Sequence, residues 1–386
     1  YIQQLTGSKT ITIDKRSEII GKYRVLLSQY LLQNYQGSFI KDPSQGNQIV
    51  SEGQSYWQIL ATDLARIDSK SARIYQADFD KLLQGTQHMI SLAKGAGNQG
   101  ELPAWKVKEQ GSQIVLDSDQ YGSTANSAAD ADIDLIRSLI YAQQLVDNGL
   151  WIDSGYGDLA QKLTSQAKFL FSDEKGMSVM RPSEDWDDFH FSDYLTPASC
   201  IEIASFAKDN SMGEGIVSFW EKAASDSMKL YGEILEDTGE FPAHVQFEVK
   251  QDGSIDVTRV HDTVQTYDGI RAPWEIGRYI IACHESTAEQ DTAVKALAAG
   301  KERDFQFTGQ QIMDSAMYLP LAIATGNKEM TTRILRNLDK AKISQDKYFE
   351  NTLYLMGTID VFFPRRVEIS APKEALPPTG MLIFSR

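Results

Sequence analysis

Apolar residues recur at helical spacing along most of this chain, and each run of this pattern predicts one helix. The first run places apolar side chains on one face of a helix, at i, i+4, i+7, i+8, i+11 and i+12; these residues are Ile19, Tyr23, Leu26, Leu27, Tyr30 and Leu31. Residues 1–16 before it are polar and β-branched, and we expect them to form an extended arm. Glycine and proline interrupt the pattern over 36–51, and the pattern resumes at Tyr56. Further helices are predicted over about 71–93, around 133–140, and over about 155–172, 196–209, 213–232, 288–302, 309–324, 326–338 and 344–360, with one more opening after 266–274.

Three segments lack the helical pattern. Residues 95–127 form a long irregular stretch, and a loop of this length in a compact domain is usually functional or disordered. Over 240–260, apolar residues alternate on both sides of Asp252-Gly253, which predicts a β-hairpin. Residues 366–386 contain three prolines and are expected to form a tail. The pattern therefore predicts one all-α domain of about twelve helices over 17–365, with a small β-hairpin insertion.

Composition narrows the partners of this domain. The 386 residues carry a formal net charge of −15, which argues against nucleic acid and against an anionic membrane surface. No run of about 18 apolar residues predicts a transmembrane helix. Two cysteines, Cys200 and Cys283, are too few for a disulfide framework, and the sequence leaves open whether they pair. The five histidines lack ligand spacing, so we expect no metal and no other cofactor.

Glu52 stands where a Gly- and Ser-rich loop gives way to a helix. A carboxylate at this junction, beside Gly53 and aromatic side chains, suits a catalytic acid. An acidic residue in a first helical turn also matches the helix dipole, so the local pattern leaves both interpretations open. Asp130, at the start of the helix near 133–140, has the same capping alternative, and its surroundings lack the glycine and distal glutamate of a Ca²⁺ loop. Trp105, in the irregular stretch, suits either sugar stacking or the core.

Three stretches together resemble glycoside hydrolase family 8, the family of bacterial endoglucanases, xylanases, chitosanases and cellulases associated with cellulose synthesis. Residues 51–56 (SEGQSY) are similar to its acid-bearing motif, 128–132 (AADAD) to its Ala-Ser/Thr-Asp-Ala/Gly-Asp signature, and 267–271 (YDGIR) to its Tyr-Asp-Ala-x-Arg block. Residues 102–105 and 194–197 have counterparts in the cellulose-synthesis branch. The resemblance covers about 20–365 and implies an (α/α)6 barrel, in agreement with the helix count.

The resemblance also implies roles for individual residues. Glu52 would be the general acid, and Asp268 the general base that activates water for inversion, with the two carboxyl groups roughly 6.5–9.5 Å apart. Asp130 would bind and help to distort the sugar at the cleavage point, and Tyr194 would line the same subsite. Arg271, three residues after Asp268 on one helix face, would favour the ionised form of that aspartate, although the pair could also be a surface ion pair.

The chain departs from the family beside these positions. Trp57 stands where close relatives have glycine, which predicts a reshaped or narrowed sugar subsite, and Tyr56 and Trp105 are also expected to contact the substrate. Ala129 replaces a serine or threonine, and residues 191–193 (Phe-Ser-Asp) replace Asn-Pro-Ser. These changes suggest glycosidase chemistry on a less usual polysaccharide.

These observations predict an inverting endo-glycanase acting on a β-linked polysaccharide, either a β-1,4-glucan or a bacterial exopolysaccharide. One alternative is a glycan-binding protein without catalysis on the same fold, and another is a lyase or unsaturated-uronyl hydrolase on a helical toroid. A polymeric substrate predicts an extracellular or cell-surface protein. The sequence starts at Tyr1, so a signal peptide or membrane anchor could have preceded it. The sequence contains no coiled-coil pattern that would indicate an oligomer, so a monomer is the simplest expectation.

Overall fold

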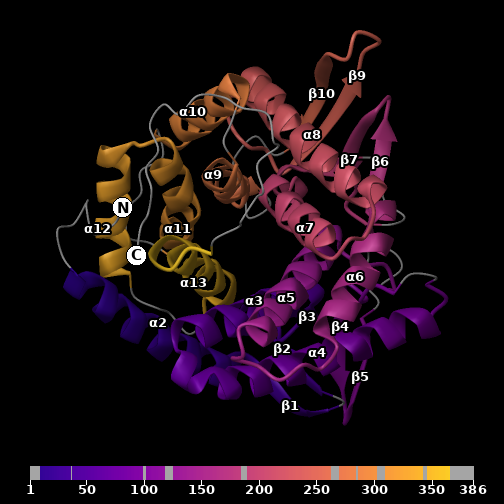
Figure 1. The fold of residues 1–386 in the computed structure, drawn as a ribbon, viewed down its shortest axis with the longest axis vertical. Helices are drawn as coiled ribbons and strands as arrows, with labels where there is room; N and C mark the ends of the chain where they lie inside the picture. Colours follow the sequence, from indigo (N-terminus) through magenta and orange to yellow (C-terminus); the bar gives the residue numbers. More distant parts are fainter. Residues whose placement is uncertain are drawn as a thin grey trace.

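Twelve α-helices dominate the structure, a computed structural model that describes residues 9–35, 37–98, 101–117, 125–183, 189–261, 269–283, 286–301, 309–341 and 346–365. Six of them form an inner ring in which each helix packs against the next (Figure 1): α3 (Ser51–Ile67), α5 (Ala129–Asp147), α7 (Pro197–Asp209), α9 (Ala272–Ala282), α11 (Gly309–Ala324) and α13 (Tyr348–Phe362). Six more pack around this ring: α2 (Lys9–Tyr30), α4 (Ala72–Gly95), α6 (Tyr156–Gln166), α8 (Glu214–Thr238), α10 (Thr287–Lys301) and α12 (Lys328–Lys340). The predicted (α/α)6 barrel is confirmed.

Burial explains which helices lie inside. In the inner helix α3, every residue is buried except Glu52 and Arg66. In the outer helix α4, the buried side chains follow one face, as in Tyr75, Phe79 and Leu82, and the other face is solvated. An amphipathic helix needs one packed face, whereas a helix of the inner ring is covered on all sides, and its buried polar side chains, such as Gln54 and Gln58, are hydrogen-bonded within the barrel.

Short antiparallel strands lie in the connections between the helices. Two sheets have three strands, in the orders β3 (Ile49–Val50), β4 (Lys106–Gln110), β5 (Gln113–Leu116) and β8 (His190–Phe191), β9 (His244–Val249), β10 (Ile255–His261). The others are the pairs β1 (Leu31–Tyr35) with β2 (Gly37–Ile40), and β6 (Phe171–Glu174) with β7 (Met177–Met180). The predicted hairpin is confirmed as β9–β10, which projects from the barrel in Figure 1.

The structure corrects three sequence predictions. The expected extended arm over 1–16 is helical from Lys9 onward, where Lys15 forms ion pairs of 2.8 Å with Glu18 and 2.9 Å with Asp339 of α12. The pair with Glu18, at i,i+3, stabilises the helix, and the pair with Asp339 holds the helix against the barrel. Both contacts favour helix where the β-branched residues favour an extended chain. The irregular stretch 95–127 contains the β4–β5 hairpin, whose turn has Gly111 at φ +63°. The helix expected over 155–172 ends at Gln166 as α6.

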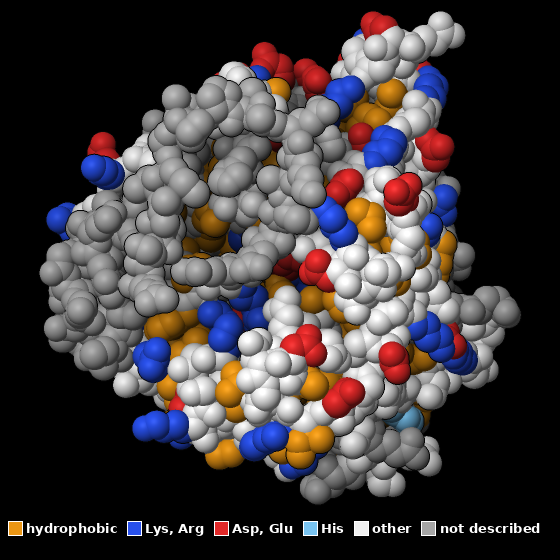
Figure 2. All heavy atoms as spheres, viewed as in Figure 1, with side chains coloured by type: hydrophobic (Ala, Val, Ile, Leu, Met, Phe, Trp, Pro, Cys, Tyr) orange, Lys and Arg blue, Asp and Glu red, His pale blue; other side chains and the backbone are white. Residues whose placement is uncertain are grey.

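The surface charge, the two cysteines and the length of the helices can be compared with the sequence predictions. On the face shown in Figure 2, acidic and basic side chains of the described residues are interspersed. Cys200 is buried in α7 and Cys283 is half-buried after α9, and they are not joined by a disulfide. Within the described ranges, no helix is both long and apolar enough to cross a membrane.

Candidate active site

The beginnings of four inner helices meet at one end of the barrel. Glu52 is in the first turn of α3, and Asp130 is in the first turn of α5. Tyr194 ends a short 3-10 helix that leads into α7, and Arg271 is the N-cap residue of α9. Residues that are far apart in sequence are therefore brought together by helices that all start at the same end. Helix N-termini also favour negative charge, which suits the two carboxylates.

Arg271 is the centre of this cluster. Its Nη1 donates to Glu52 Oε1, to the Tyr56 hydroxyl and to Asp130 Oδ2, the last at 2.7 Å. Its Nε and Nη2 both reach Asp193 Oδ2, at 2.8 and 2.7 Å. The side chain of Arg271 is only 6% exposed, so these contacts lie in a desolvated setting where charged hydrogen bonds are strong. One guanidinium thus holds three carboxyl groups in fixed positions.

The surroundings of Glu52 favour its protonated form. Burial raises the pKa of Glu52 to about 8, and the negative charges of Asp130 and Asp193 act in the same direction, whereas Arg271 and the Tyr56 hydroxyl oppose the increase. Three carboxyl groups share one guanidinium, so keeping one of them neutral reduces the repulsion among them. Glu52 has the most exposed side chain of the three, at 23%, against 4% for Asp130 and 0% for Asp193. A proton on Glu52 is therefore the one closest to solvent and to an incoming ligand.

The residues around Glu52 explain why the motif 51–56 has its composition. Gln54 is fully buried and joins two elements outside α3: its amide nitrogen donates to Ser38 O and Leu82 O, at 2.8 and 2.7 Å. Ser55 Oγ donates to Ala131 O of α5 at 2.8 Å. A Cβ on Gly53 would lie 2.2 Å from the Tyr348 hydroxyl oxygen. The motif therefore fixes the start of α3 against α4, α5 and α13.

Trp105 lies beside the start of α3, and its expected contact with substrate stays a prediction. Its carbonyl oxygen accepts from Ser51 N at 2.9 Å, so the β3–β4 pairing holds the residue before Glu52. The Trp105 ring is half-buried, and Lys106 Nζ lies 5.4 Å from its centroid. The structure thus brings Trp105 to the catalytic end of the barrel.

The prediction for Trp57 is wrong. Its side chain is 0% exposed and packs against Tyr23 and Tyr30 of α2, with ring centroids 5.4 and 5.8 Å away. Residue 57 is five positions after Glu52 on α3, so its side chain faces the outer ring of helices rather than the catalytic end. Trp57 fills the interface between α2 and α3 and lines no sugar subsite. Tyr56 is also buried, at 1% exposed, and acts on Glu52 through its hydroxyl, at 3.0 Å from Oε1.

Asp268, the expected general base, lies outside the described residues. The described chain resumes at Gly269, and helix α9 begins only at Ala272. Arg271 is the N-cap residue of α9, and the expected pairing of Asp268 with Arg271 stays a prediction. The described carboxyl partners of Arg271 are those of Glu52, Asp130 and Asp193.

Asp193 is the residue that the sequence analysis missed. Its side chain is fully buried and forms two bonds to Arg271 from the side opposite Glu52. The substitution in residues 191–193 was noted as a departure from the family, but a local pattern does not reveal a partner 78 residues away. Asp193 orients the guanidinium that touches the acid.

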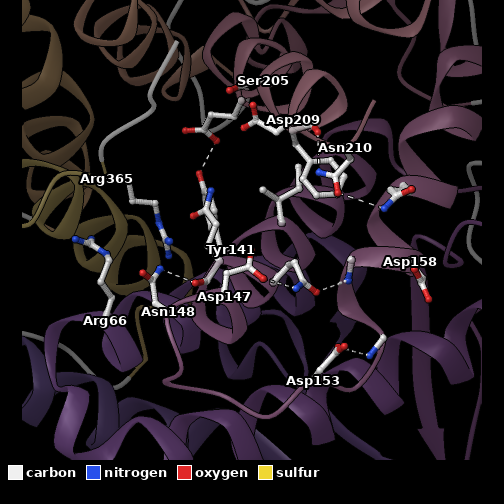
Figure 3. A pocket seen from close by; sticks show the side chains of 18 of the residues that line it. Arg66, Tyr141, Asp147, Asn148, Asp153, Asp158, Ser205, Asp209, Asn210 and Arg365 are labelled. Atoms are coloured by element: carbon white, nitrogen blue, oxygen red, sulfur yellow. Dashed lines mark hydrogen bonds between the residues drawn. The ribbon is translucent and has the colours of Figure 1, made fainter. Parts of the chain in front are cut away.

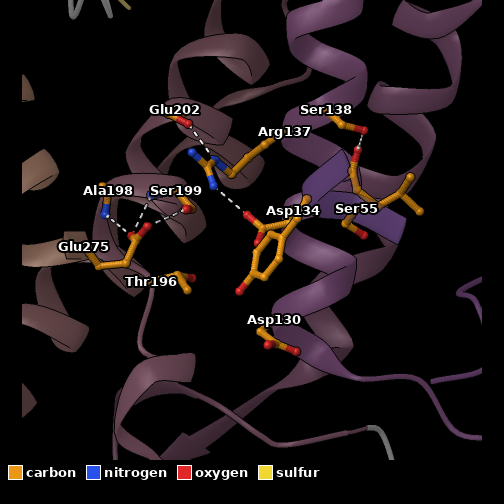
Figure 4. Close-up of polar contacts among 12 residues, drawn as sticks. Ser55, Asp130, Asp134, Arg137, Ser138, Thr196, Ala198, Ser199, Glu202 and Glu275 are labelled. Carbon is orange, nitrogen blue, oxygen red and sulfur yellow. Dashed lines mark hydrogen bonds and ion pairs between the residues drawn. The ribbon is translucent and has the colours of Figure 1, made fainter. Parts of the chain in front are cut away.

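A buried ionic network lies further along the inner helices (Figure 4). Arg137 of α5 binds Asp134 and Glu202, at 2.5 and 2.8 Å. Arg278 of α9 binds Glu202 and Glu275, both at 2.5 Å. Burial raises the pKa of Asp134 to about 6, although Arg137 opposes this increase. For Glu202, burial is outweighed by Arg278 and Arg137, and the pKa falls to about 2. The network links α5, α7 and α9 and so fixes the helices that carry the catalytic cluster.

A cavity of about 910 Å³ opens at the other end of the barrel (Figure 3). It is lined by residues near the ends of α3, α5 and α7, including Arg66, Asp147 and Asp209. Because Glu52 and Asp130 start these helices and the cavity residues end them, the cavity is distinct from the catalytic cluster. Among the described residues, no group of three or more His, Cys, Asp or Glu side chains is placed to hold a metal ion.

Comparisons with known proteins agree with this geometry. The model of the family "Glycosyl hydrolases family 8" matches residues 8–360. Among solved structures, a cold-adapted family 8 xylanase has a TM-score of 0.69 at 16% identity, covering 93% of this chain and 92% of its own. A β-1,3-1,4-glucanase from Paenibacillus sp. X4 has a TM-score of 0.69 at 16% identity, covering 92% of each chain. A reducing-end-xylose releasing exo-oligoxylanase has a TM-score of 0.68 at 14% identity, covering 92% of this chain and 94% of its own.

No curated protein sequence matches the chain. At 14–16% identity, the solved structures establish the fold alone. The family match spans nearly the whole described chain, and the motif residues Glu52, Asp130 and Arg271 lie in contact at one end of the barrel. The chain belongs to glycosyl hydrolases family 8.

Proposed function

We propose that this glycoside hydrolase is an inverting endo-glycanase that cleaves a β-linked polysaccharide, with Glu52 as its general acid. The observation that carries the proposal is the contact of the largely buried Glu52 carboxyl with Arg271 and the Tyr56 hydroxyl, beside Asp130, where four inner helices begin. A carboxyl group whose pKa is raised to about 8 retains its proton at neutral pH and can transfer it to a departing glycosidic oxygen. General acid catalysis of this kind contributes roughly 10²–10⁴ in rate.

The other residues have complementary roles in this proposal. Arg271 holds Glu52 and Asp130 in register, and Asp130 Oδ1 also accepts from Ala131 N at 2.8 Å, which leaves its carboxylate fixed against a sugar hydroxyl. The Tyr194 ring lies 5.7 Å from the Arg271 guanidinium and forms a wall of the same site. Asp268, by its place in the motif 267–271, would be the base that activates water on the opposite face of the sugar.

The substrate class rests on the chemistry of the site and on the relatives. The structural neighbours are xylanases and a β-1,3-1,4-glucanase, all of which act on neutral β-linked sugars. The protein carries a net charge of −15, which disfavours a polyanionic polymer. We therefore propose a neutral β-linked polymer, either a plant-type glycan or a bacterial exopolysaccharide. Such a polymer lies outside the cell, so we propose that the enzyme acts there or at the cell surface.

The test is release of reducing ends from xylan, mixed-linkage β-1,3-1,4-glucan, β-1,4-glucan, chitosan and a bacterial exopolysaccharide. Wild type, Glu52→Gln and Asp268→Asn are compared, with Glu221→Gln as the matched control on an exposed position of α8. We expect activity on at least one polymer, a loss of two or more orders of magnitude in both site variants, and full activity in the control. A wild type that binds a polymer without releasing reducing ends would replace this proposal with the glycan-binding one.

A further inference from the structure

The strands next to the catalytic cluster carry aromatic rings on the face that does not pack on the core. In the β8–β9 pairing, His190 is opposite Val245, and Phe191 is opposite His244. His190 and Val245 are buried, at 6% and 1% exposed, so their shared face is the inner one. Phe191 and His244 are half-buried on the other face. Side chains alternate between the faces of a strand, so Phe189 belongs to the outer face with Phe191.

These outer rings form a continuous strip with Tyr194. The Phe191 ring centroid is 4.7 Å from that of Tyr194, 4.6 Å from that of His244 and 5.3 Å from that of Phe189. Tyr194 in turn lies 5.7 Å from the guanidinium of Arg271. We call Tyr194, Phe191, Phe189 and His244 the aromatic strip. It begins at the catalytic cluster and extends along the β8–β9 sheet.

The central ring, Phe191, lies outside the hydrophobic core of the described residues. That core includes Val245 and, at its edge, Tyr194 and Phe247, but not Phe191. An outer strand face is usually polar, as Gln246 and Glu248 are further along β9. Large aromatic side chains outside the core that are continuous with a catalytic centre are typical of a ligand-binding surface.

We infer that the aromatic strip is a carbohydrate-binding subsite that extends the catalytic cleft beyond Tyr194, with Phe191 as its central ring. The ligand class is a neutral pyranose within a β-linked chain, because the apolar C–H face of such a sugar packs on an aromatic face without needing an ionic partner. This inference rests on the proposed function, and it specifies the path that the substrate chain takes away from the cleaved bond. It also gives residues 191–193 two separate roles, since Phe191 faces the strip while Asp193 is buried against Arg271.

The aromatic strip would contribute to substrate binding but not to the chemical step. A stacked sugar away from the cleaved bond is held equally in the ground state and in the transition state. Removing such a contact raises KM and leaves kcat nearly unchanged. A substrate too short to reach the strip is unaffected by the same change.

The test uses four variants of the full chain. Phe191→Ala removes the ring, Phe191→Leu keeps apolar volume without an aromatic face, and Phe191→Tyr keeps the face. Phe169→Ala is the matched control, because Phe169 is an exposed ring, at 41%, outside the site. Binding to xylan, mixed-linkage β-1,3-1,4-glucan, β-1,4-glucan and chitosan is measured by affinity gel electrophoresis, and KM and kcat are measured on any polymer that is cleaved.

We expect Phe191→Ala and Phe191→Leu to weaken polymer binding and raise KM by about tenfold, with kcat within about twofold of wild type, as for the loss of one aromatic contact. Phe191→Tyr and Phe169→Ala should behave as wild type. Recovery by leucine would mean that Phe191 only packs, and would overturn the inference. Unchanged binding in Phe191→Ala would also overturn it, as would a wild type that binds none of the four polymers.

The experiments distinguish a failure of this inference from a failure of the proposed function. Binding that depends on the Phe191 ring, in a protein that releases no reducing ends, would support the strip and refute the hydrolase. Hydrolysis lost in Glu52→Gln but insensitive to Phe191 would support the hydrolase and refute the strip.

Discussion

Replacing Glu52 by glutamine should stabilise the folded protein at alkaline pH. Glutamine has nearly the same shape and can still accept a hydrogen bond from Arg271, but it does not titrate. In the wild type, burial raises the pKa of Glu52 to about 8, from an ordinary value of 4.5 in the unfolded chain. Between these two values the folded protein holds a proton that the unfolded chain has released. The free energy of unfolding of the wild type therefore falls as the pH rises through this window.

The size of the effect follows from the two pKa values. The difference between 4.5 and about 8 corresponds to roughly 5 kcal/mol, at 1.36 kcal/mol for each pH unit. Glu52 is 23% exposed and contacts Arg271, so solvent and small movements relieve part of this penalty. We expect the Glu52→Gln variant to gain on the order of 2–4 kcal/mol over wild type between pH 5 and pH 8.5.

The assay is urea unfolding of wild type and Glu52→Gln at several pH values from 5 to 8.5. Titrating groups away from this cluster are common to both proteins and cancel in the difference, so the contribution of Glu52 and its coupling to the neighbouring carboxyl groups remains. Glu221→Gln, on the exposed face of α8, should show a difference from wild type that does not vary with pH. A constant difference for Glu52→Gln, or a wild type that gains stability relative to it as the pH rises, would refute the protonated acid.

Three further predictions concern the surroundings of this acid. Asp193→Asn removes a negative charge that raises the pKa of Glu52, so the alkaline limb of the kcat/KM profile should move to lower pH; an unmoved limb would argue against this coupling. Trp57→Ala should lower the free energy of unfolding by about 3–5 kcal/mol in urea titrations with little change in KM, and the reverse result would restore the subsite interpretation. Gly53→Ala should destabilise by about 1–3 kcal/mol because its Cβ would meet the Tyr348 hydroxyl, and adding Tyr348→Phe should recover much of this loss unless the strain lies elsewhere.

The sequence predicted the fold because the helical pattern had a single physical meaning, but it did not predict the contacts that Arg271 makes with Glu52, Asp130 and Asp193. The 3.6-residue periodicity gave the helices because an inner or outer barrel helix must bury a defined face. Glu52 and Asp130 were singled out by the resemblance of residues 51–56 and 128–132 to family motifs, and the structure shows that both stand at helix starts which the barrel brings together. The β4–β5 hairpin was missed because its strands do not alternate, although the two-residue turn Gly111-Ser112 contained a hairpin signal.

Other features depend on contacts that no local pattern encodes. Trp57 occupies a family glycine position, but its environment is set by Tyr23 and Tyr30 of α2, which precede it by more than 25 residues. Asp193 is defined as a functional residue only by its bonds to Arg271. The roles of Trp57 and Asp193 depend on contacts with residues that are distant in the sequence. The sequence can therefore mark these positions as unusual, but their roles become visible only in the structure.

The most direct test of Glu52 as the general acid varies the leaving group. A natural glycosidic oxygen needs a proton as it departs, whereas 2,4-dinitrophenolate is stable without one. On a polymer that the wild type cleaves, Glu52→Gln should lose two or more orders of magnitude in kcat/KM. On the 2,4-dinitrophenyl glycoside of the matching disaccharide, the same variant should retain activity close to wild type. Equal losses on both substrates would contradict the assignment, because they would show that Glu52 contributes something other than the proton.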